Sequence, residues 1–359
     1  MLHHDRVGIE RGVGSEVVVA PLAQQQTVGA ESGSDGPEAM ARASRRQTAG
    51  VSKRRLAVVM IIGDPWGTEI DGLRRALGDS QLRRIVPHIT LIPPINVRDD
   101  ALPEVLAVMR NAAATRRGPV TLTVGPVATF APANPVLYLQ VEPAGEVRSL
   151  FNACLVGPLE RPQQREFVPH VTIDINRPDD EHAAARSLLS GYRADVTIER
   201  LDLMQLAMID GRERWQPIAD ADFGGAVSVD AGSLRVALTT STLVDPVASA
   251  TLELDSDRLL GNGMGDGLVV TARDPQGRAV GLAAGRRRGR RASVLRAIFV
   301  ADGARRQGLA RRLVEAWERV AVSGGAVRAV APGLSSDERA LLAHLGWDQS
   351  EPIPDRRFS

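Results

Sequence analysis

The sequence predicts an α+β protein with two folded domains, the first of which contains an internal repeat. A chain of 359 residues is too long for one ordinary hydrophobic core and suggests about two domains. From residue 54 to 223, strand-like and helix-like segments alternate, and their order recurs after about 80 residues. A Gly- and Ala-rich stretch at 224–232 is expected to link this domain to a second one at 233–359.

The composition is typical of a soluble globular protein, with 43% hydrophobic and 24% charged residues. The longest apolar run is of strand length, far short of the roughly 20 residues that span a bilayer. The N-terminus lacks a signal-peptide pattern, so we expect a cytoplasmic protein without a membrane partner. Residues 1–53 show no sustained period and are expected to form a disordered extension.

Lysine is nearly absent, since Lys53 is the only one among 44 basic residues. A P-loop needs a Gly-Lys-Ser/Thr sequence, and one class of ligase works through an adenylylated lysine. Both classes are therefore close to excluded. Phosphate contacts must come from arginine, histidine, hydroxyl groups or backbone amides.

Each copy of the repeat is predicted to run strand, helix, strand, helix, strand. The first copy is expected at Leu56–Ile62, Thr68–Leu77, Val86–Ile92, Asp100–Ala114 and Val120–Val124. The second is expected at Val136–Val141, Gly145–Leu155, Val168–Ile175, Asp179–Leu189 and Asp195–Ile198, with a further strand at Leu203–Ile209. A generic α+β domain without a repeat would also fit this alternation, so the sequence motifs are needed to distinguish the two possibilities.

Two motifs occupy the same place in the two copies. The chain reads Pro-His-Ile-Thr-Leu around His88 and Thr90, and Pro-His-Val-Thr-Ile around His170 and Thr172. Successive side chains of a strand point to opposite faces, so each histidine shares a face with its threonine. We expect both pairs to line one cleft.

This set of groups suits phosphodiester chemistry. An imidazole titrates near neutral pH, so one histidine can accept a proton while the other donates one. The threonine hydroxyls can hydrogen-bond the non-bridging phosphate oxygens. A single His-x-Thr sequence would be weak, because a histidine in an apolar strand is usually a core residue. Two matched copies favour the functional interpretation, for which no metal is needed.

With these motifs, residues 54–223 resemble the two-histidine (2H) phosphoesterase superfamily, and within it the bacterial 2′–5′ RNA ligase-like proteins. The resemblance implies a bilobal, pseudo-twofold fold with His88, Thr90, His170 and Thr172 as catalytic residues in a central cleft. It also implies 2′,5′-ligase or 2′,3′-cyclic phosphodiesterase activity on RNA ends or on cyclic or 2′,5′-linked nucleotides. Neither a metal nor a nucleotide cofactor is implied.

Other residues near the motifs keep two interpretations each. By alternation, Asp174 lies on the face of His170 and could orient an imidazole, or could face solvent. His182 begins a polar helix and is expected at the surface. Four more side chains could contact a base or phosphate, or could be core and loop residues: Phe130, Phe167, Arg161 and Arg165.

The second domain contains a predicted anion-binding loop. Strands are expected at Arg235–Thr239, Leu268–Arg273, Ala279–Ala284 and Ser293–Val300, and a helix at Arg311–Val322. The loop before this helix can present free backbone amides to an anion, and Gly308 permits close approach. A solvated, basic first turn is the structural alternative.

This region, about 233–350, resembles the GNAT acetyltransferases in its Arg305-x-x-Gly308-x-Ala310 sequence and its Gly346-Trp347 ending. The resemblance implies N-acetyl transfer from acetyl-CoA to an acceptor that the sequence does not identify. It implies that the cofactor-binding residues are Ile298, Val300, Arg305, Arg306, Gln307, Gly308, Leu309 and Ala310. Leu342 replaces the tyrosine that is usual in the closing helix, which favours acetyl-CoA binding over efficient transfer; His344 could act as an acid or be a surface residue.

The sequence thus predicts a phosphoesterase-like domain fused to a GNAT-like domain. Two rival interpretations remain. The first domain could hold RNA or nucleotides without turnover. Alternatively, N-acetyl transfer could be the main activity, with the first domain only binding a nucleotide or RNA.

Overall fold

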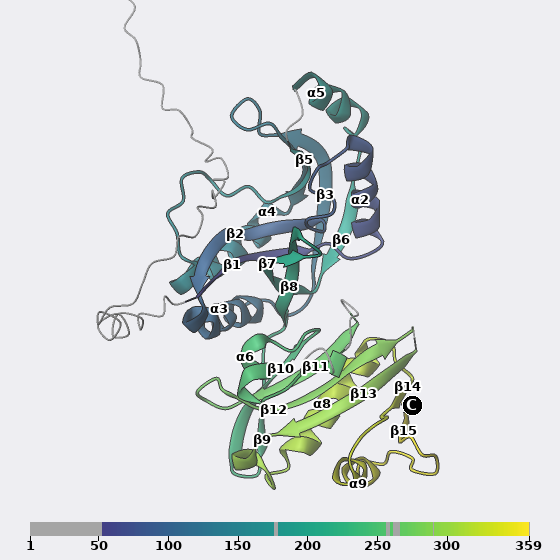
Figure 1. The fold of residues 1–359 in the computed structure, drawn as a ribbon. Coiled ribbons are helices and arrows are strands. Elements are labelled where there is room, and N and C mark those ends of the chain that lie inside the picture. Colours follow the sequence, from purple (N-terminus) through teal and green to yellow (C-terminus); the bar gives the residue numbers. More distant parts are fainter. Residues whose placement is uncertain (1–51, 176–178, 256–258, 261–265, 290, 359) are drawn as a thin grey trace, which may run out of the picture. The chain divides into compact units, whose positions relative to one another are not determined.

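The computed structural model describes residues 52–175, 179–255, 259–260, 266–289 and 291–358 (Figure 1). The predicted extension lies outside these ranges apart from its last two residues, of which Lys53 already opens a strand. The described strands form an eight-stranded sheet and a seven-stranded sheet. Within these ranges every helix is too short or too polar to traverse a lipid bilayer.

The eight-stranded sheet contains both copies of the predicted repeat, and their common element order is confirmed. The first copy consists of β1 (Lys53–Ile61), α2 (Trp66–Leu77), β2 (His88–Arg98), α3 (Leu102–Ala114) and β3 (Val120–Thr129). The second consists of β4 (Val136–Glu142), α4 (Ala144–Cys154), β5 (His170–Ile175), α5 (Asp179–Leu188) and β6 (Ala194–Ile198). Short 3-10 turns, η1 (Asp99–Ala101) and η2 (Gly157–Leu159), precede α3 and follow α4.

The strand order, β6-β3-β4-β5-β2-β1-β7-β8, places the two motif strands at the centre of the sheet. The third strands of both copies, β3 and β6, lie on the β4 side. The hairpin of β7 (Arg200–Ile209) and β8 (Arg212–Asp222) lies beside β1 instead. The sequence did not predict β8, because its first seven residues stay at least partly exposed and form no apolar run.

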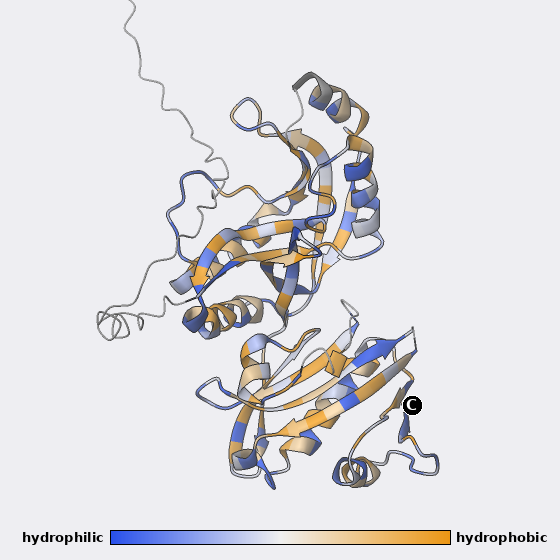
Figure 2. Cartoon of the chain, in the orientation of Figure 1, coloured by the Kyte–Doolittle hydropathy of each residue, from blue (hydrophilic) through white to orange (hydrophobic). Residues whose placement is uncertain are grey.

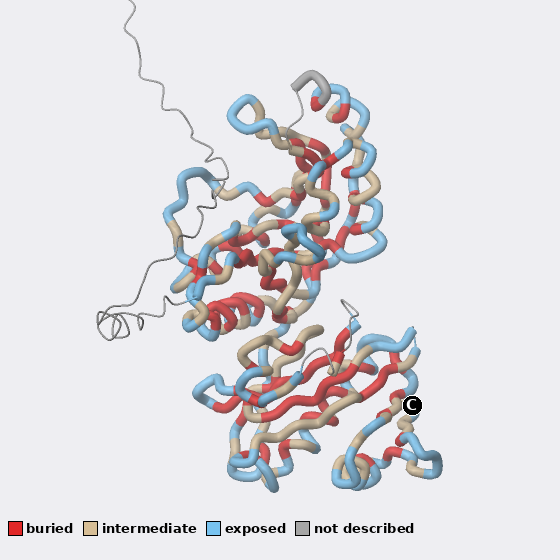
Figure 3. The backbone as a smooth tube through the Cα atoms, in the orientation of Figure 1, coloured by how far each residue is buried: buried red, intermediate tan, exposed pale blue. Residues whose placement is uncertain are grey.

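The core of this sheet follows from strand alternation. Leu56, Val58 and Met60 on β1 are fully buried in the large cluster that includes the inner faces of α3 and α4 (Figure 3). The intervening Ala57 and Val59 point to the opposite face, where they form a smaller cluster with residues of β7 and β8. The helices therefore cover one face, and the other is left for the motif side chains.

The seven-stranded sheet has the order β15-β14-β13-β12-β11-β10-β9. Its elements are β9 (Val227–Ala231), β10 (Leu234–Ser241), α6 (Pro246–Thr251), β11 (Gly267–Arg273), β12 (Ala279–Arg288), β13 (Ala292–Val300), η3 (Asp302–Ala304), α8 (Leu309–Ser323), β14 (Arg328–Val330), α9 (Ser336–His344) and β15 (Asp355–Arg357). The stretch expected to be a linker at 224–232 contains β9, which pairs with β10 along its whole length. Apolar residues fill the central strands of this sheet (Figure 2).

Helix α8 packs closely on this sheet because two glycines lie beneath it. A Cβ atom at Gly281 would come 2.9 Å from Leu313, and one at Gly285 would come 2.9 Å from Trp317. Trp317 is fully buried, and its Nε1 donates to the carbonyl of Leu268 at 3.0 Å. Larger residues at either glycine would push the helix, and the loop that precedes it, away from the sheet.

Candidate functional site

The four motif side chains lie close together because the two motif strands pair through one residue of each. Ile89 on β2 pairs with Val171 on β5, and both are fully buried on the core face. In an antiparallel pair the neighbours on either side also lie opposite one another. The motif side chains flank this pair on the other face of the sheet. The predicted convergence of the two motifs therefore occurs at the centre of the sheet.

Both histidines are held in the same tautomer. Nδ1 of His88 lies 2.8 Å from the carbonyl oxygen of Val86, and Nδ1 of His170 lies 2.7 Å from that of Val168. A carbonyl oxygen only accepts hydrogen bonds, so each Nδ1 carries the proton that is donated. The Nε2 atom of a neutral ring then has a free lone pair, which suits proton transfer.

A cavity of about 210 Å³ lies beside His88. Both motifs contribute to its wall, together with β1, α2, the α2–β2 segment and β8: the lining residues are Ala57, Val59, Arg74, Asp79, Gln81, Ile85, Val86, His88, Thr90, Pro94, Thr172 and Trp215. Burial, with smaller effects from the charges of Arg74 and His170, lowers the pKa of His88 to about 4 against the hydrogen bond to Val86. His88 is therefore neutral at physiological pH in the ligand-free protein.

His170 has aromatic neighbours. Its ring meets Phe130 edge-on, with centroids 5.0 Å apart, and meets Tyr138 at 5.3 Å. Phe130 and Tyr138 stack on one another at 4.1 Å. Burial lowers the pKa of His170 too, against the hydrogen bond to Val168. Phe130 thus contacts the motif histidine, whereas Phe167 stacks on Phe151 at 4.1 Å against the core.

Asp174 does not share the face of His170. The register between β4 and β5 shifts, so that Tyr138 pairs with Thr172 and Leu137 pairs with Asp174. This bulge inserts Ile173 and turns the next side chain to the core face. There Asp174 is buried and lies 3.1 Å from Nε2 of His182. The expectation that His182 lies at the surface is wrong, because its side chain is fully buried.

The two predicted arginines lie outside the cavity wall. Nη1 of Arg161 donates to the carbonyl of Pro93 at 3.3 Å, and Arg165 is exposed. Sequence reasoning missed Arg74, Tyr138 and Trp215. Arg74 was hidden because it continues the charged side of an amphipathic helix, and Trp215 because its strand was not predicted. Tyr138 was included only as part of a strand.

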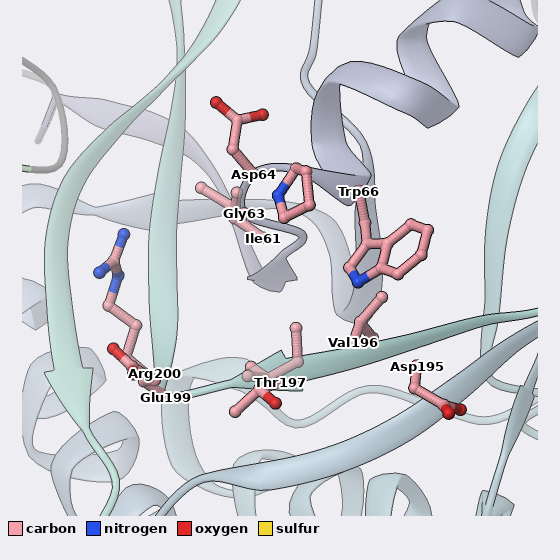
Figure 4. Close-up of a pocket in the computed structure, with 11 residues that line it drawn as sticks. Ile61, Gly63, Asp64, Trp66, Asp195, Val196, Thr197, Glu199 and Arg200 are labelled. Atoms are coloured by element: carbon pink, nitrogen blue, oxygen red, sulfur yellow. The ribbon is translucent and has the colours of Figure 1, made fainter.

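A second cavity, of about 390 Å³, opens where β1 ends and β6 runs into β7 (Figure 4). The indole ring of Trp66 faces the residues of β6 across it. Asp195, Thr197 and Glu199 are also among the residues that line it. Ile61 in its wall pairs with His88 in the ladder of β1 and β2, so this cavity neighbours the histidine site.

In the seven-stranded sheet, the predicted anion loop has the backbone of a binding turn. Arg306 and Gly308 have positive φ angles, 61° and 78°, and α8 begins directly after Gly308. No described side chain caps this helix start, so its first amide groups stay available. Leu309 is buried in the core, and Gln307 accepts hydrogen bonds from the backbone and hydroxyl of Ser233. Arg305 bonds to the carbonyl of Val300 and to Asp302.

The strand before this loop has an open side. β13 pairs with β14 only from Ala292 to Val294. Farther along, the backbone N–H of Ile298 donates to Oε1 of Glu338 at 3.3 Å, while Oε2 of Glu338 accepts from Ser335 at the start of α9. A ligand that pairs with Ile298 must displace this carboxylate. His344 is exposed and Leu342 is fully buried.

Comparisons with known proteins follow the same division of the chain. Residues 62–208 match the family described as the 2'-5' RNA ligase superfamily, and residues 240–347 match the acetyltransferase (GNAT) family. A protein of Bacillus pumilus named "Putative phosphoesterase" is 34% identical over 128 residues, which are 35% of this chain and 74% of that protein. A Bacillus cytotoxicus relative with a similar name is 32% identical over 152 residues, covering 42% of this chain and 87% of its own.

Solved structures with low sequence identity resemble each part of the chain. Escherichia coli LigT, in a crystal structure with 3'-AMP, is 18% identical, and the match covers 48% of this chain and 99% of LigT with a TM-score of 0.35. A Klebsiella pneumoniae protein named "putative acyl-CoA N-acyltransferase" is 17% identical, and the match covers 34% of this chain and 98% of that protein with a TM-score of 0.30.

Proposed function

Because this chain belongs to the 2'-5' RNA ligase superfamily through residues 62–208 and to the GNAT family through residues 240–347, we propose that it joins a phosphodiesterase site to an acetyl-CoA site. The first site hydrolyses 2′,3′-cyclic phosphates or 2′,5′-linked nucleotides at RNA ends, and in reverse it joins such ends. The convergence of two Nδ1-protonated imidazoles at the pair of β2 and β5 carries this proposal.

In the hydrolytic direction, the neutral ring of His88 accepts a proton at Nε2 from a water molecule. The water oxygen forms a bond to phosphorus while the bond to the ribose 3′-oxygen breaks, so the phosphate stays on the 2′-oxygen. His170, in its protonated form, gives its Nε2 proton to that leaving oxygen. Thr90 and Thr172 donate hydrogen bonds to the non-bridging oxygens as their negative charge grows. When the 5′-hydroxyl of a second RNA end takes the place of water, the same groups form a bond from its oxygen to phosphorus, break the bond to the 3′-oxygen and leave a 2′,5′ linkage.

The second cavity supplies room for the remainder of a nucleotide substrate. The smaller cavity, which His88, Thr90 and Thr172 line, has room for the reacting phosphate group. Trp66 offers a flat apolar face on which a base can stack, since every base has a π-face. We place the nucleoside next to the reacting phosphate there, within reach of Thr197 on β6.

Hydrolysis of 2′,3′-cyclic nucleotides tests the first site. Wild-type protein should release a 2′-phosphate, and His88→Ala should be slower by about 10²–10⁴-fold because a positioned base is lost. His344→Ala is the matched control, since it removes an exposed imidazole outside the site and should keep the wild-type rate. Equal rates for wild type and His88→Ala would reject the enzyme assignment. Binding without turnover in the wild type would favour the nucleotide-holding interpretation.

For the second site, we place the pyrophosphate of acetyl-CoA at the uncapped start of α8. Backbone amides after Gly308 would bind its oxygens, with added charge from Arg305 and Arg306. The pantetheine arm would lie along Ile298 and Val300 and take the amide that Glu338 now holds. Leu342 provides no acid, so we propose cofactor binding with slow transfer to an amine.

Calorimetry with acetyl-CoA tests this second site. Gly308→Glu should abolish binding, because a side chain at a φ of 78° is strained and its carboxylate repels the pyrophosphate. Glu338→Gln should tighten binding, because a neutral amide is displaced more easily than a carboxylate. No heat from the wild-type protein would reject acetyl-CoA as its ligand.

A further inference from the structure

Arg74 is a buried cation in the wall of the histidine cavity. Its side chain is 3% exposed, and its Nε lies 2.8 Å from Oδ2 of Asp79, which is 1% exposed. Nη1 lies 2.8 Å from Oδ1 of Asp71 and donates to the carbonyl oxygen of Ile85 at 2.9 Å. A guanidinium group can make these contacts together because its donors point in several fixed directions.

These contacts fix the backbone of residues 79–86, the segment that precedes His88. Oδ1 of Asp79 accepts from the backbone of Gln81, so the start of the segment is fixed to the same ion pair. Ile85, at its end, is held through its carbonyl by Arg74. The next residue is Val86, whose carbonyl accepts the Nδ1 proton of His88. A continuous chain of hydrogen bonds and one peptide unit therefore connects the buried arginine to the ring.

The segment before His170 is supported differently. Its nearest ion pair joins Arg148 to Glu166 at 2.9 Å, and these side chains are 41% and 74% exposed. An exposed pair of this kind holds its backbone weakly. Among the residues that the structure describes, a buried ion pair thus supports the segment before His88 but not the segment before His170.

We propose that Arg74 is a positioning residue for His88: it fixes the Ile85–Val86 peptide so that the ring keeps its Nδ1–H tautomer, and its positive charge adds to the burial that keeps the ring neutral. This arrangement makes His88 the base and leaves the acid to His170. The base assignment rests on the proposed phosphodiesterase function, whereas the link between Arg74 and the ring does not.

The charged groups around His88 act together in this scheme. Arg74 approaches from α2, Asp79 from the following segment, and His170 from β5. The facing residues of β1 and β8 are Ala57, Val59 and Trp215, which do not titrate. Both Arg74 and a protonated His170 oppose a proton on His88, so the removal of Arg74 must raise the pKa of His88.

Two variants of the full chain separate charge from geometry. The double variant Arg74→Met/Asp79→Leu removes the ion pair without leaving one buried charge alone. Arg74→Lys keeps the charge, but a single ammonium group cannot hold Asp79 and the Ile85 carbonyl in the same fork geometry. Arg148→Gln is the matched control, because it breaks the exposed pair near the other histidine.

Histidine ¹⁵N NMR reports the tautomer and the pKa of each ring, and thermal melting reports the fold. In the double variant, the pKa of His88 should rise by about one unit and the Nε2–H tautomer should appear, with His170 unchanged. The apparent pKa of the acid limb in the pH profile of kcat/KM for a 2′,3′-cyclic nucleotide should rise by the same amount. In Arg74→Lys, the pKa of His88 should stay low, because the positive charge is kept. Both the Nδ1–H and the Nε2–H tautomers of His88 should be populated, and kcat/KM should fall about tenfold. Arg148→Gln should change none of these.

A folded double variant whose His88 keeps both its tautomer and its pKa would overturn the proposal. A changed pKa with an unmoved acid limb would overturn the base assignment. If the double variant does not fold, Arg74→Lys provides the test. A single Nδ1–H tautomer of His88 in this variant, together with wild-type kcat/KM, would contradict the proposal. Loss of the phosphodiesterase function itself would appear as no turnover in the wild type, while the NMR result still decides the role of Arg74.

Discussion

His88 and His170 hold equivalent places in the two copies of the repeat, yet their surroundings differ. For both rings, a carbonyl two residues upstream accepts the Nδ1 proton. A buried arginine–aspartate pair supports the segment before His88, whereas His170 packs edge-on against Phe130 and Tyr138. The repeated backbone fixes the same tautomer twice, and the side chains that are not repeated make the two rings unequal.

The inequality bears on which ring takes a proton. Burial, together with the neighbouring charge of Arg74, lowers the pKa of His88 to about 4. Burial also lowers the pKa of His170, and in both rings the upstream hydrogen bond opposes this effect, but His170 has no neighbouring cation among the causes of its shift. An anionic phosphate in the cleft favours protonation of a nearby ring, and His170 is the one with less opposing charge.

The largest effect is expected from removal of either imidazole, with different consequences for pH dependence. His170→Ala should lower kcat/KM for a 2′,3′-cyclic nucleotide by about 10²–10⁴-fold and lose the alkaline limb, because the acid is gone. His88→Ala should lose the acid limb instead. Rate profiles from pH 4 to 10 measure this, and identical profiles for the two variants would mean that the rings are equivalent.

A second prediction concerns stability against pH. The pKa of His88 is about 4 in the folded protein and about 6.5 in the unfolded chain, so between these values only the unfolded chain binds the proton. Stability therefore falls as the pH drops through this window, by up to about 3 kcal/mol. Urea unfolding at pH 7 and pH 4.5 should show this loss, and His88→Gln should reduce it. His344→Gln, at an exposed position, should leave the loss unchanged.

The threonines should contribute next. Thr90→Val and Thr172→Val keep the side-chain shape and remove one hydroxyl from each half of the site. Each should lower kcat by about 10²-fold with little change in KM, because these hydrogen bonds strengthen as charge develops on the phosphate. Steady-state kinetics for both variants measure this, and a change confined to KM would assign them to ground-state binding alone.

The smallest effect is expected from the aromatic support of His170. Phe130→Ala opens the ring to water, so the pKa of His170 should rise toward its ordinary value and the alkaline limb of kcat/KM should move up by about half a unit. Phe151→Ala is the matched control, because it removes an aromatic pair near the same strand that does not contact the histidine. A limb that moves equally in both variants would point to general loosening of the sheet.

Much of the fold could be predicted because it depends on local patterns. The run Leu56–Ile62 and the helical spacing after Asp100 identify buried elements by their own periodicity. β8 could not be predicted in this way, because its polar first half is a strand only through its pairing with β7. The stretch expected to be a linker contains a strand-like run at Val227–Val229, and this run becomes β9 through its pairing with β10.

The sequence by itself determined that each histidine shares a strand face with its threonine, because that alternation is a local property of the backbone. Only the tertiary structure decided that Ile89 pairs with Val171, that Arg74 lies against the segment before His88, and that a bulge turns Asp174 to the core. Register between distant strands and the burial of a charge depend on contacts between residues far apart in the chain. No pattern within one segment encodes them.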